Sequence, residues 1–179
     1  MTRRDELVTE RLRLRRLVPA DGDAHAVLMG EIDGSEPATR ERSRQAIAER
    51  DARFEEDGFG VLAVVRLDDD RLIGRVSLDI WNRVDWTSGW TTAQLGEDAE
   101  IELGWMLLRE VWGHGYATEA AAALRDHAFG ELGVRRLISL IHPENVRSIR
   151  VAERLGAVHE TDVELARWGP SRLYAHQPG

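Results

Sequence analysis

The sequence of 179 residues contains no cysteine. This absence excludes disulfide bonds, a cysteine nucleophile and a metal site built on thiolates. It also suits the reducing cytoplasm, where we expect the protein. Long hydrophobic runs are missing as well, because no stretch approaches the roughly 18 apolar residues that span a bilayer. The arginines that follow Met1 lead into no apolar segment, so we predict neither a secretory signal nor a membrane partner.

Positive charge is in deficit, with 24 Lys and Arg against 32 Asp and Glu and a formal net charge of −8. Binding to nucleic acid relies on clustered basic side chains, so we predict no nucleic-acid partner. An acidic chain weakly favours a cationic substrate such as an amine. The six histidines include no pair at metal-ligand spacing beside a carboxylate, and we therefore predict no metal.

The hydrophobic pattern predicts one domain over residues 1–179, with a mixed α/β fold. Strands are predicted at 9–17, 59–67, 72–80, 101–108, 136–141, 157–161 and 172–176. Helices are predicted at 19–29 with Asp21 as N-cap, at 39–56, from the turn near residue 115 to about 132, and at 146–155. A break is expected at 34–37. Hairpins together with strand–helix–strand crossovers imply a mixed, mostly antiparallel sheet flanked by helices.

Residues 82–98 form the one long segment without clean periodicity. They include Trp86 and Trp90, with Trp81 at their edge. Loops of this length are uncommon and often functional. Two interpretations stay open: the tryptophans cover the core or a contact in a homodimer, or they bind an acceptor substrate.

Residues 109–120 place two glycines, Gly113 and Gly115, between a predicted strand and a predicted helix. Glycine lets the backbone turn tightly and come close to a ligand. The helix that follows directs unpaired N–H groups and its positive dipole end at the same point. This combination predicts a site for phosphate or pyrophosphate.

Residues 101–105 and 112–120 resemble the acetyl-CoA-binding motif of the GCN5-related N-acetyltransferases (GNAT). A second block at 142–157 and the start at 7–15 agree, and the likeness is greatest to the ribosomal-protein-alanine acetyltransferase branch. The resemblance covers most of the chain. It implies a GNAT-type acyl-CoA N-acyltransferase fold, with acetyl-CoA or another acyl-CoA as co-substrate.

The resemblance also implies which residues hold the cofactor. Backbone groups of the turn would cradle the CoA pyrophosphate: Val111, Trp112, Gly113, His114, Gly115, Tyr116 and Ala117. The strand before it would lie beside the pantetheine arm and offer backbone contacts: Met106, Leu107 and Leu108. Asn145 would hydrogen-bond the same arm. Glu110 departs from the Gln or Arg of the family motif, and we expect its carboxylate to point away from the pyrophosphate.

The implied chemistry is direct attack of an amine on a thioester. An alkyl amine has a pKa near 10.4, so a base must take a proton. Glu102 is the candidate base or acceptor-binding residue, because the branch that the chain resembles often carries an acidic residue near the start of this strand. Alternation places Glu102 on one strand face with Glu100 and Gly104, where it can face the acceptor cleft. The alternative is that both glutamates are solvated. Trp81, Trp86 and Trp90 are the other candidates for substrate binding.

The usual general-acid tyrosine of many relatives is replaced by Ala152. Ser148, a serine typical of this branch, would instead donate a hydrogen bond to the departing thiolate. Asn145 and Ser148 also suit a helix N-terminus, and capping is compatible with function. Two function classes follow: an N-acetyltransferase acting on a protein N-terminus or a small amine, or a non-catalytic CoA-binding protein with the same fold. A third interpretation is a different nucleotide-binding domain, which would bind NAD or ATP tightly.

Overall fold

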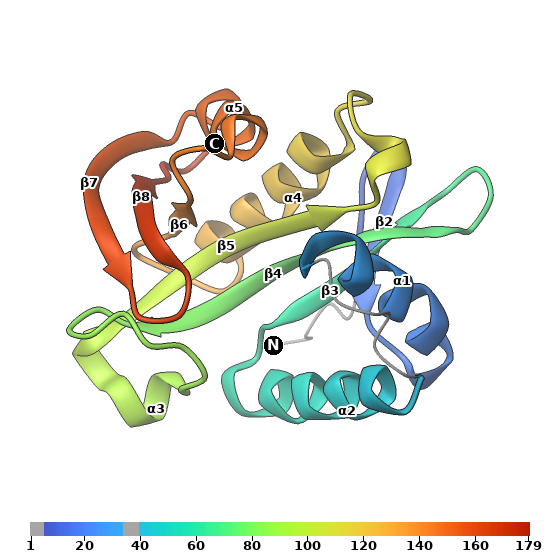
Figure 1. The fold of residues 1–179 in the computed structure, drawn as a ribbon, viewed down its shortest axis with the longest axis horizontal. Coiled ribbons are helices and arrows are strands. Elements are labelled where there is room, and N and C mark those ends of the chain that lie inside the picture. The colour runs from blue at the N-terminus through green and yellow to red at the C-terminus, as the bar shows by residue number, and fades with distance from the viewer. Residues whose placement is uncertain (1–5, 34–39) are drawn as a thin grey trace. The chain divides into compact units, whose positions relative to one another are not determined.

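The computed structural model describes residues 6–33 and 40–179, so the break predicted at 34–37 lies outside the described residues (Figure 1). The strands are β1 (Glu6–Val8), β2 (Leu12–Arg16), β3 (Val61–Arg66), β4 (Leu72–Asn82), β5 (Ala99–Leu107), β6 (Ile138–Ile141), β7 (Val158–Leu165) and β8 (Gly169–Ala175). The α-helices are α1 (Gly22–Asp33), α2 (Arg40–Asp57), α3 (Thr92–Leu95), α4 (Tyr116–Gly130) and α5 (Val146–Arg154). Three 3-10 turns are η1 (Pro19–Asp21), η2 (Gly96–Asp98) and η3 (Arg109–Val111).

The strands are hydrogen-bonded in the order β1-β2-β3-β4-β5-β6-β8-β7. β5 and β6 pair in parallel, whereas β1–β2, β2–β3, β6–β8 and β7–β8 are antiparallel. The sheet is therefore mixed and mostly antiparallel, and this prediction from the sequence is confirmed.

Contacts divide the chain into two compact units. The first unit comprises residues up to Val76 and Trp105–Ala120, and the second comprises Ser77–Gly104 and Ala121–Gly179. Each unit is built from two separate stretches of sequence, so neither corresponds to a continuous segment of the chain. A single domain over 1–179 stays a prediction.

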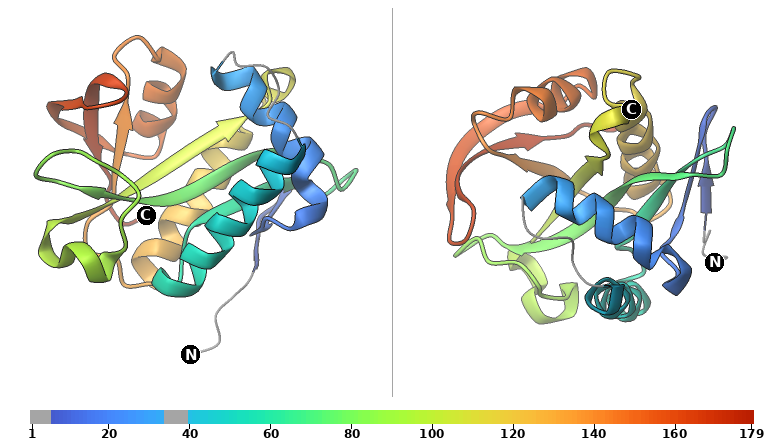
Figure 2. Two further views of the ribbon diagram at one scale, coloured as in Figure 1. Left: turned by 60° about the horizontal axis from the view of Figure 1, so that its bottom comes forward. Right: turned by 45° about the vertical axis from the view of Figure 1, so that its right-hand side comes forward.

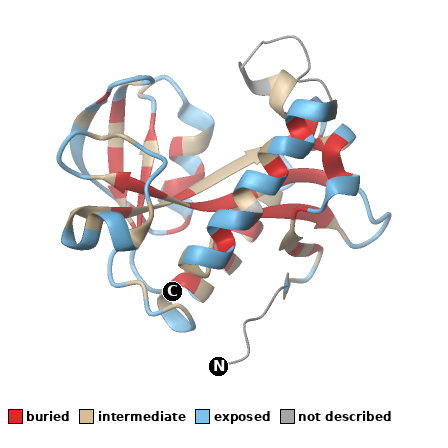
Figure 3. Cartoon of the chain, turned by 90° about the horizontal axis from the view of Figure 1, so that it is seen from below, coloured by how far each residue is buried: buried red, intermediate tan, exposed pale blue. Residues whose placement is uncertain are grey.

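In the first unit, alternation along β2 buries Leu12 and Leu14 completely. A core cluster joins Leu17, Ile47 of α2 and residues of β3 and β4. Helices α1 and α2 pack against each other (Figure 2). Most of α2 is exposed along one side, as Figure 3 shows, while Ile47 and Phe54 are buried. This pattern confirms the predicted surface helix.

In the second unit, β6, β8 and β7 form an antiparallel group, and α5 contacts β6. Gly156 follows α5 with φ +74° and Gly133 follows α4 with φ +69°, as expected for glycines that end helices. No helix among the described residues is long and apolar enough to span a membrane.

Four details differ from the sequence prediction. The strand predicted at 9–17 is a hairpin, because the Thr9 N–H donates to the Leu12 carbonyl at 2.8 Å and closes a turn without glycine or proline. Asp21 is not the cap of α1. It lies in η1, and its carboxylate accepts the Val18 N–H at 2.8 Å and pairs with Arg15 at 2.7 Å.

The segment 82–98 is not a plain loop. It contains the one-turn helix α3, which begins with a capping box: Gln94 N–H donates to Thr91 Oγ1, and Thr91 N–H donates to Gln94 Oε1. The last hairpin is also longer than predicted. Gly169 and Pro170 belong to β8, and the turn lies before them.

Candidate active site

The chain turns sharply between β5 and α4, and two glycines make the turn possible. Gly113 and Gly115 have φ angles of +84° and +82°, which residues with a side chain rarely adopt. A Cβ atom at Gly113 would meet nothing within 4 Å, so conformation and not crowding requires glycine there. α4 begins at Tyr116, and the first N–H groups of a helix have no acceptor within it. The turn therefore combines backbone donors with a positive helix dipole, which suits a phosphate.

Glu110 and Arg109, which precede the glycines, form polar contacts with other residues of the first unit. Glu110 forms an ion pair with Arg71, so its carboxylate is held by a partner of opposite charge. The Arg109 N–H donates to Glu31 Oε2 at 2.9 Å, and its guanidinium lies 5.8 Å from the ring centroid of Trp112. The contacts of Arg109 are thus with Glu31 and Trp112 at the protein surface.

The end of β5 was expected to offer backbone groups to a cofactor. The Leu108 N–H donates to the Ile73 carbonyl at 2.9 Å, and the Leu108 carbonyl accepts from the Val111 N–H at 3.1 Å. The Leu107 carbonyl accepts the indole N–H of Trp112 at 2.9 Å. The N–H of Leu108 is therefore engaged within the protein, and cofactor contacts through Met106, Leu107 and Leu108 stay predictions.

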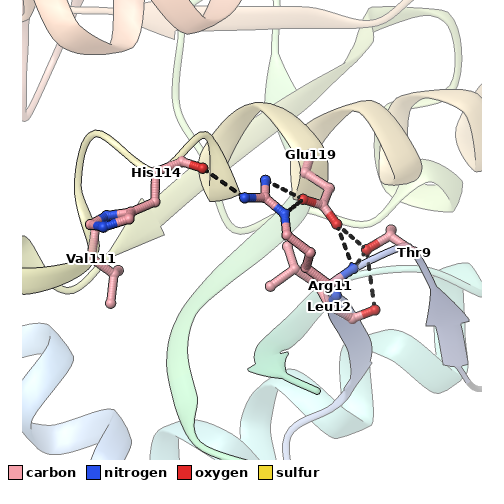
Figure 4. Close-up of polar contacts among 6 residues, drawn as sticks. All are labelled: Thr9, Arg11, Leu12, Val111, His114 and Glu119. Atoms are coloured by element: carbon pink, nitrogen blue, oxygen red, sulfur yellow. Dashed lines mark hydrogen bonds and ion pairs between the residues drawn. The ribbon is translucent and has the colours of Figure 1, made fainter. Parts of the chain in front are cut away.

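Side chains from distant parts of the sequence meet beneath the glycine turn (Figure 4). Glu119 of α4 accepts hydrogen bonds from Thr9 Oγ1 at 2.6 Å and from Arg11 Nε at 2.7 Å. Another nitrogen of the same guanidinium donates to the His114 carbonyl at 2.9 Å. The His114 ring stacks on Tyr116 with centroids 5.9 Å apart, and its Nδ1 lies 3.1 Å from the Trp112 carbonyl.

Glu102 lies in the second unit, where β5 and β6 separate. The ladder between these strands consists of the pair Glu102 and Ile138. Beyond it, the Leu140 N–H donates to Glu102 Oε1 at 3.3 Å. The indole N–H of Trp81, on β4, donates to Glu102 Oε2 at 2.5 Å. Donors from both neighbouring strands therefore hold this carboxylate.

Glu100 and Trp81, near Glu102, are both buried. Glu100 is not solvated: it is 9% exposed and accepts Arg136 Nε at 2.9 Å. Trp81 is 7% exposed and uses its indole N–H on Glu102. The ring therefore orients the Glu102 carboxylate, and binding of an acceptor by Trp81 stays a prediction.

Asp79 on β4 is a carboxylate that the sequence reasoning passed over. Its Oδ2 accepts from Ser77 Oγ at 2.7 Å, and a Cβ atom added at Gly104 would lie 3.8 Å from the same oxygen. Within residues 6–33 and 40–179 no hydrogen bond engages Oδ1. Asp79 therefore lies over the strand face that carries Gly104 and, by alternation, Glu102. The signal in the sequence is the one carboxylate in a strand that is otherwise mostly apolar, with Arg75, Ser77 and Asn82 as its other polar residues.

Asn145 and Ser148 lie together at the start of α5. Asn145 is the N-cap, and its Oδ1 accepts the Ser148 N–H at 3.2 Å. The capping role of Asn145 is confirmed. The capping hydrogen bond uses the backbone N–H of Ser148 and does not involve its hydroxyl. Ala152 lies one turn farther along α5 and is completely buried. Its methyl side chain has no proton to donate.

The other predicted substrate contacts lie in the segment before α3. Trp90 is 39% exposed, and its indole N–H donates to Thr87 Oγ1 at 2.9 Å. Trp86 has φ +54°, an uncommon conformation for a residue with a large side chain. Their role in binding an acceptor stays a prediction. Among the described residues, no three metal-binding side chains gather into a cluster.

Known bacterial proteins resemble this chain in sequence. Curated relatives match it over 33% to 59% of their own length. One of them, the probable N-acetyltransferase YjcK of Bacillus subtilis, is 33% identical over 118 residues, which is 66% of this chain and 59% of that protein.

Solved structures share the fold over nearly the whole chain. An acetyltransferase from Agrobacterium tumefaciens is 28% identical, with a TM-score of 0.75 and coverage of 96% of this chain and 94% of that one. The ribosomal L7/L12 alpha-N-protein acetyltransferase RimL, in complex with coenzyme A, is 16% identical with a TM-score of 0.74 and coverage of 96% and 97%. The model of the acetyltransferase (GNAT) domain matches residues 11–158, and this chain therefore belongs to the GNAT family of acetyltransferases.

Proposed function

We propose that the protein is an acetyl-CoA-dependent N-acetyltransferase that acts on a primary amine. The single observation that carries the proposal is the glycine turn, with Gly113 and Gly115 at positive φ directly before α4. Its backbone donors suit a pyrophosphate. The CoA in the RimL structure and the shared fold support the same choice of co-substrate.

Acetyl-CoA supplies an acyl group activated as a thioester. In the overall reaction the amine nitrogen forms a bond to the acyl carbon and the carbon–sulfur bond breaks. A cationic amine loses one proton before it attacks, and the nitrogen loses a second proton afterwards, while the CoA thiolate takes up one proton and the other goes to solvent. We assign removal of the first proton to Glu102, directly or through water. Its carboxylate is oriented by Trp81 and the Leu140 N–H, so it need not reorganise to act.

Asp79 and Ser148 take supporting roles in this proposal. A carboxylate with one oxygen engaged by Ser77 has its other oxygen available to bind a cationic amine before it loses its proton. Ser148 would donate its hydroxyl hydrogen bond to the sulfur as negative charge develops there. The buried Ala152 cannot supply that donor.

Turnover with acetyl-CoA and a panel of amines tests the proposal. The panel should include peptides with free N-terminal amines and small alkyl amines, with free thiol and the acetylated product measured together. Thiol release coupled to acetylation of at least one amine supports it. Binding of CoA without acetylation of any amine would support the non-catalytic alternative, which the absence of a tyrosine at position 152 favours. Residence in the cytoplasm and pairing of two copies stay predictions.

A further inference from the structure

The turn that we assign to the pyrophosphate is contacted by Arg11, which lies 103 residues before His114 in the sequence. Arg11 lies between β1 and β2, and Glu119 lies in the first turns of α4. Two nitrogens of the Arg11 guanidinium bind Glu119 Oε2, at 2.7 Å and 2.5 Å. The Arg11 backbone N–H donates to Glu119 Oε1 at 2.9 Å. The pair is therefore fixed by both the side chain and the backbone of Arg11.

The remaining guanidinium nitrogen of Arg11 donates to the carbonyl of His114 at 2.9 Å. In a trans peptide the carbonyl and the following N–H point in opposite directions. A carbonyl directed at Arg11 therefore directs the Gly115 N–H away from Arg11. Figure 4 shows the guanidinium between His114 and Glu119. The arginine acts on the peptide that joins His114 to Gly115, between the two glycines of the turn.

The surroundings fix Arg11 in this orientation. Its guanidinium lies over the ring of Tyr116, 4.6 Å from the centroid. A Cβ atom at Gly115 would lie 3.5 Å from the guanidinium, which places the two groups in van der Waals contact. Burial by itself raises the pKa of Glu119, but hydrogen bonds from Thr9 and Arg11 lower it below its ordinary value. Glu119 is therefore held as an anion that balances the guanidinium charge.

We propose that Arg11 and Glu119 are positioning residues that orient the His114–Gly115 peptide so that the turn presents its N–H groups to the CoA pyrophosphate. The inference rests on the proposed function. It predicts a defect confined to ligands that carry a pyrophosphate. Acetyl-pantetheine, which has the thioester but neither the pyrophosphate nor the nucleoside, separates this role from a general loss of structure.

The test compares wild type with Arg11→Met, Arg11→Lys and Glu119→Gln, using acetyl-CoA and S-acetyl-pantetheine with the same amine. For Arg11→Met we expect kcat/KM with acetyl-CoA to fall about tenfold or more, mainly through KM, and to change less than about twofold with acetyl-pantetheine. Arg11→Lys keeps the charge but cannot serve Glu119 and the His114 carbonyl together, so it should share the defect. Glu119→Gln keeps the acceptor oxygen and should be milder.

Arg15→Met is the matched control, since it removes a two-nitrogen ion pair with Asp21 in the same unit without touching the turn. It should leave the ratio between the two donors unchanged. Equal losses with both donors in the Arg11 variants would overturn the inference while leaving the acetyltransferase proposal intact. If wild type turns over neither donor, the proposed function fails, and CoA and pantetheine affinities from calorimetry then test the turn by itself.

Discussion

Glu102 and Asp79 are carboxylates with different hydrogen-bond environments, and the difference assigns them different tasks. Glu102 accepts N–H groups from Trp81 and Leu140, which fix the positions of both of its oxygens. Asp79 has its contact with Ser77 through one oxygen. An oriented carboxylate suits proton transfer, and one with an oxygen to spare suits binding of a cation.

Replacement of each carboxylate by its amide separates these tasks. Glu102→Gln should lower kcat by about a hundredfold, within the range for loss of a general base, with a small change in KM for the amine. Asp79→Asn should instead raise KM for the amine, with a smaller effect on kcat. Steady-state kinetics with a varied amine measures both. The opposite pattern, with kcat lost in Asp79→Asn, would exchange the two assignments.

Ser148 has its N–H in the cap of α5 and its hydroxyl outside that bond. Ser148→Ala should therefore keep the helix and CoA affinity while lowering kcat about tenfold, since one donor to the developing thiolate is lost. A leaving group of lower pKa needs less help, so an aryl thioester should restore part of the rate. Loss of CoA affinity in proportion to kcat would reduce Ser148 to a binding or capping residue.

The glycine turn is the element on which CoA affinity is expected to depend. Gly115→Val forces a β-branched side chain into φ +82° and brings its Cβ to 3.5 Å from the Arg11 guanidinium, so the turn that is expected to hold the pyrophosphate must shift. CoA affinity should fall about tenfold to a hundredfold, as backbone strain of this kind costs about 1–3 kcal/mol. Calorimetry with CoA measures the change.

Gly133→Val is the matched control for this element. Gly133 follows α4 with φ +69° and has open space around it, so the substitution brings comparable strain outside the turn. It should cost stability and spare CoA affinity. A Gly115→Val protein that binds CoA as wild type does would contradict the placement of the pyrophosphate.

Elements with local signals could be predicted from the sequence, and contacts that depend on distant residues could not. Gly113 and Gly115 mark their turn by themselves, and Asn145 marks the start of α5. The pairing of Arg11 with Glu119 was not foreseen, because 108 residues separate the two in the sequence. Asp79 was missed for a related reason: a single acidic residue in a strand resembles a solvated position until the neighbouring strand shows Gly104 beside it.

Two buried histidines link the stability of the folded protein to pH. His25 is 2% exposed and His176 is 5% exposed, and among the described residues the Nδ1 of each is buried without a hydrogen-bond partner. Burial, and next the nearby cation Arg50, lowers the pKa of His25 to about 4. Burial, followed by the charge of Arg125, lowers the pKa of His176 to about 4. Both imidazoles are thus held neutral in the folded protein.

Their effect on stability has a definite sign. The ordinary pKa of 6.5 applies in the unfolded chain, which therefore binds protons at a higher pH than the folded protein does. The stabilising effect of the two neutral histidines is complete above about pH 6.5 and is lost as the pH falls toward 4. With about 1.4 kcal/mol for each pKa unit, each histidine accounts for about 3 kcal/mol of the decline.

Urea denaturation between pH 7.5 and pH 4.5 measures this loss at about half-unit steps. His25→Gln and His176→Gln remove one titrating group each, so each variant should show a shallower decline in unfolding free energy than wild type, whatever its stability at pH 7.5. His142→Gln, at an exposed position, is the control and should leave the slope unchanged. Wild-type stability that stays constant between pH 6.5 and pH 4.5 would contradict the assignment, because both histidines would then titrate alike in the folded and unfolded states.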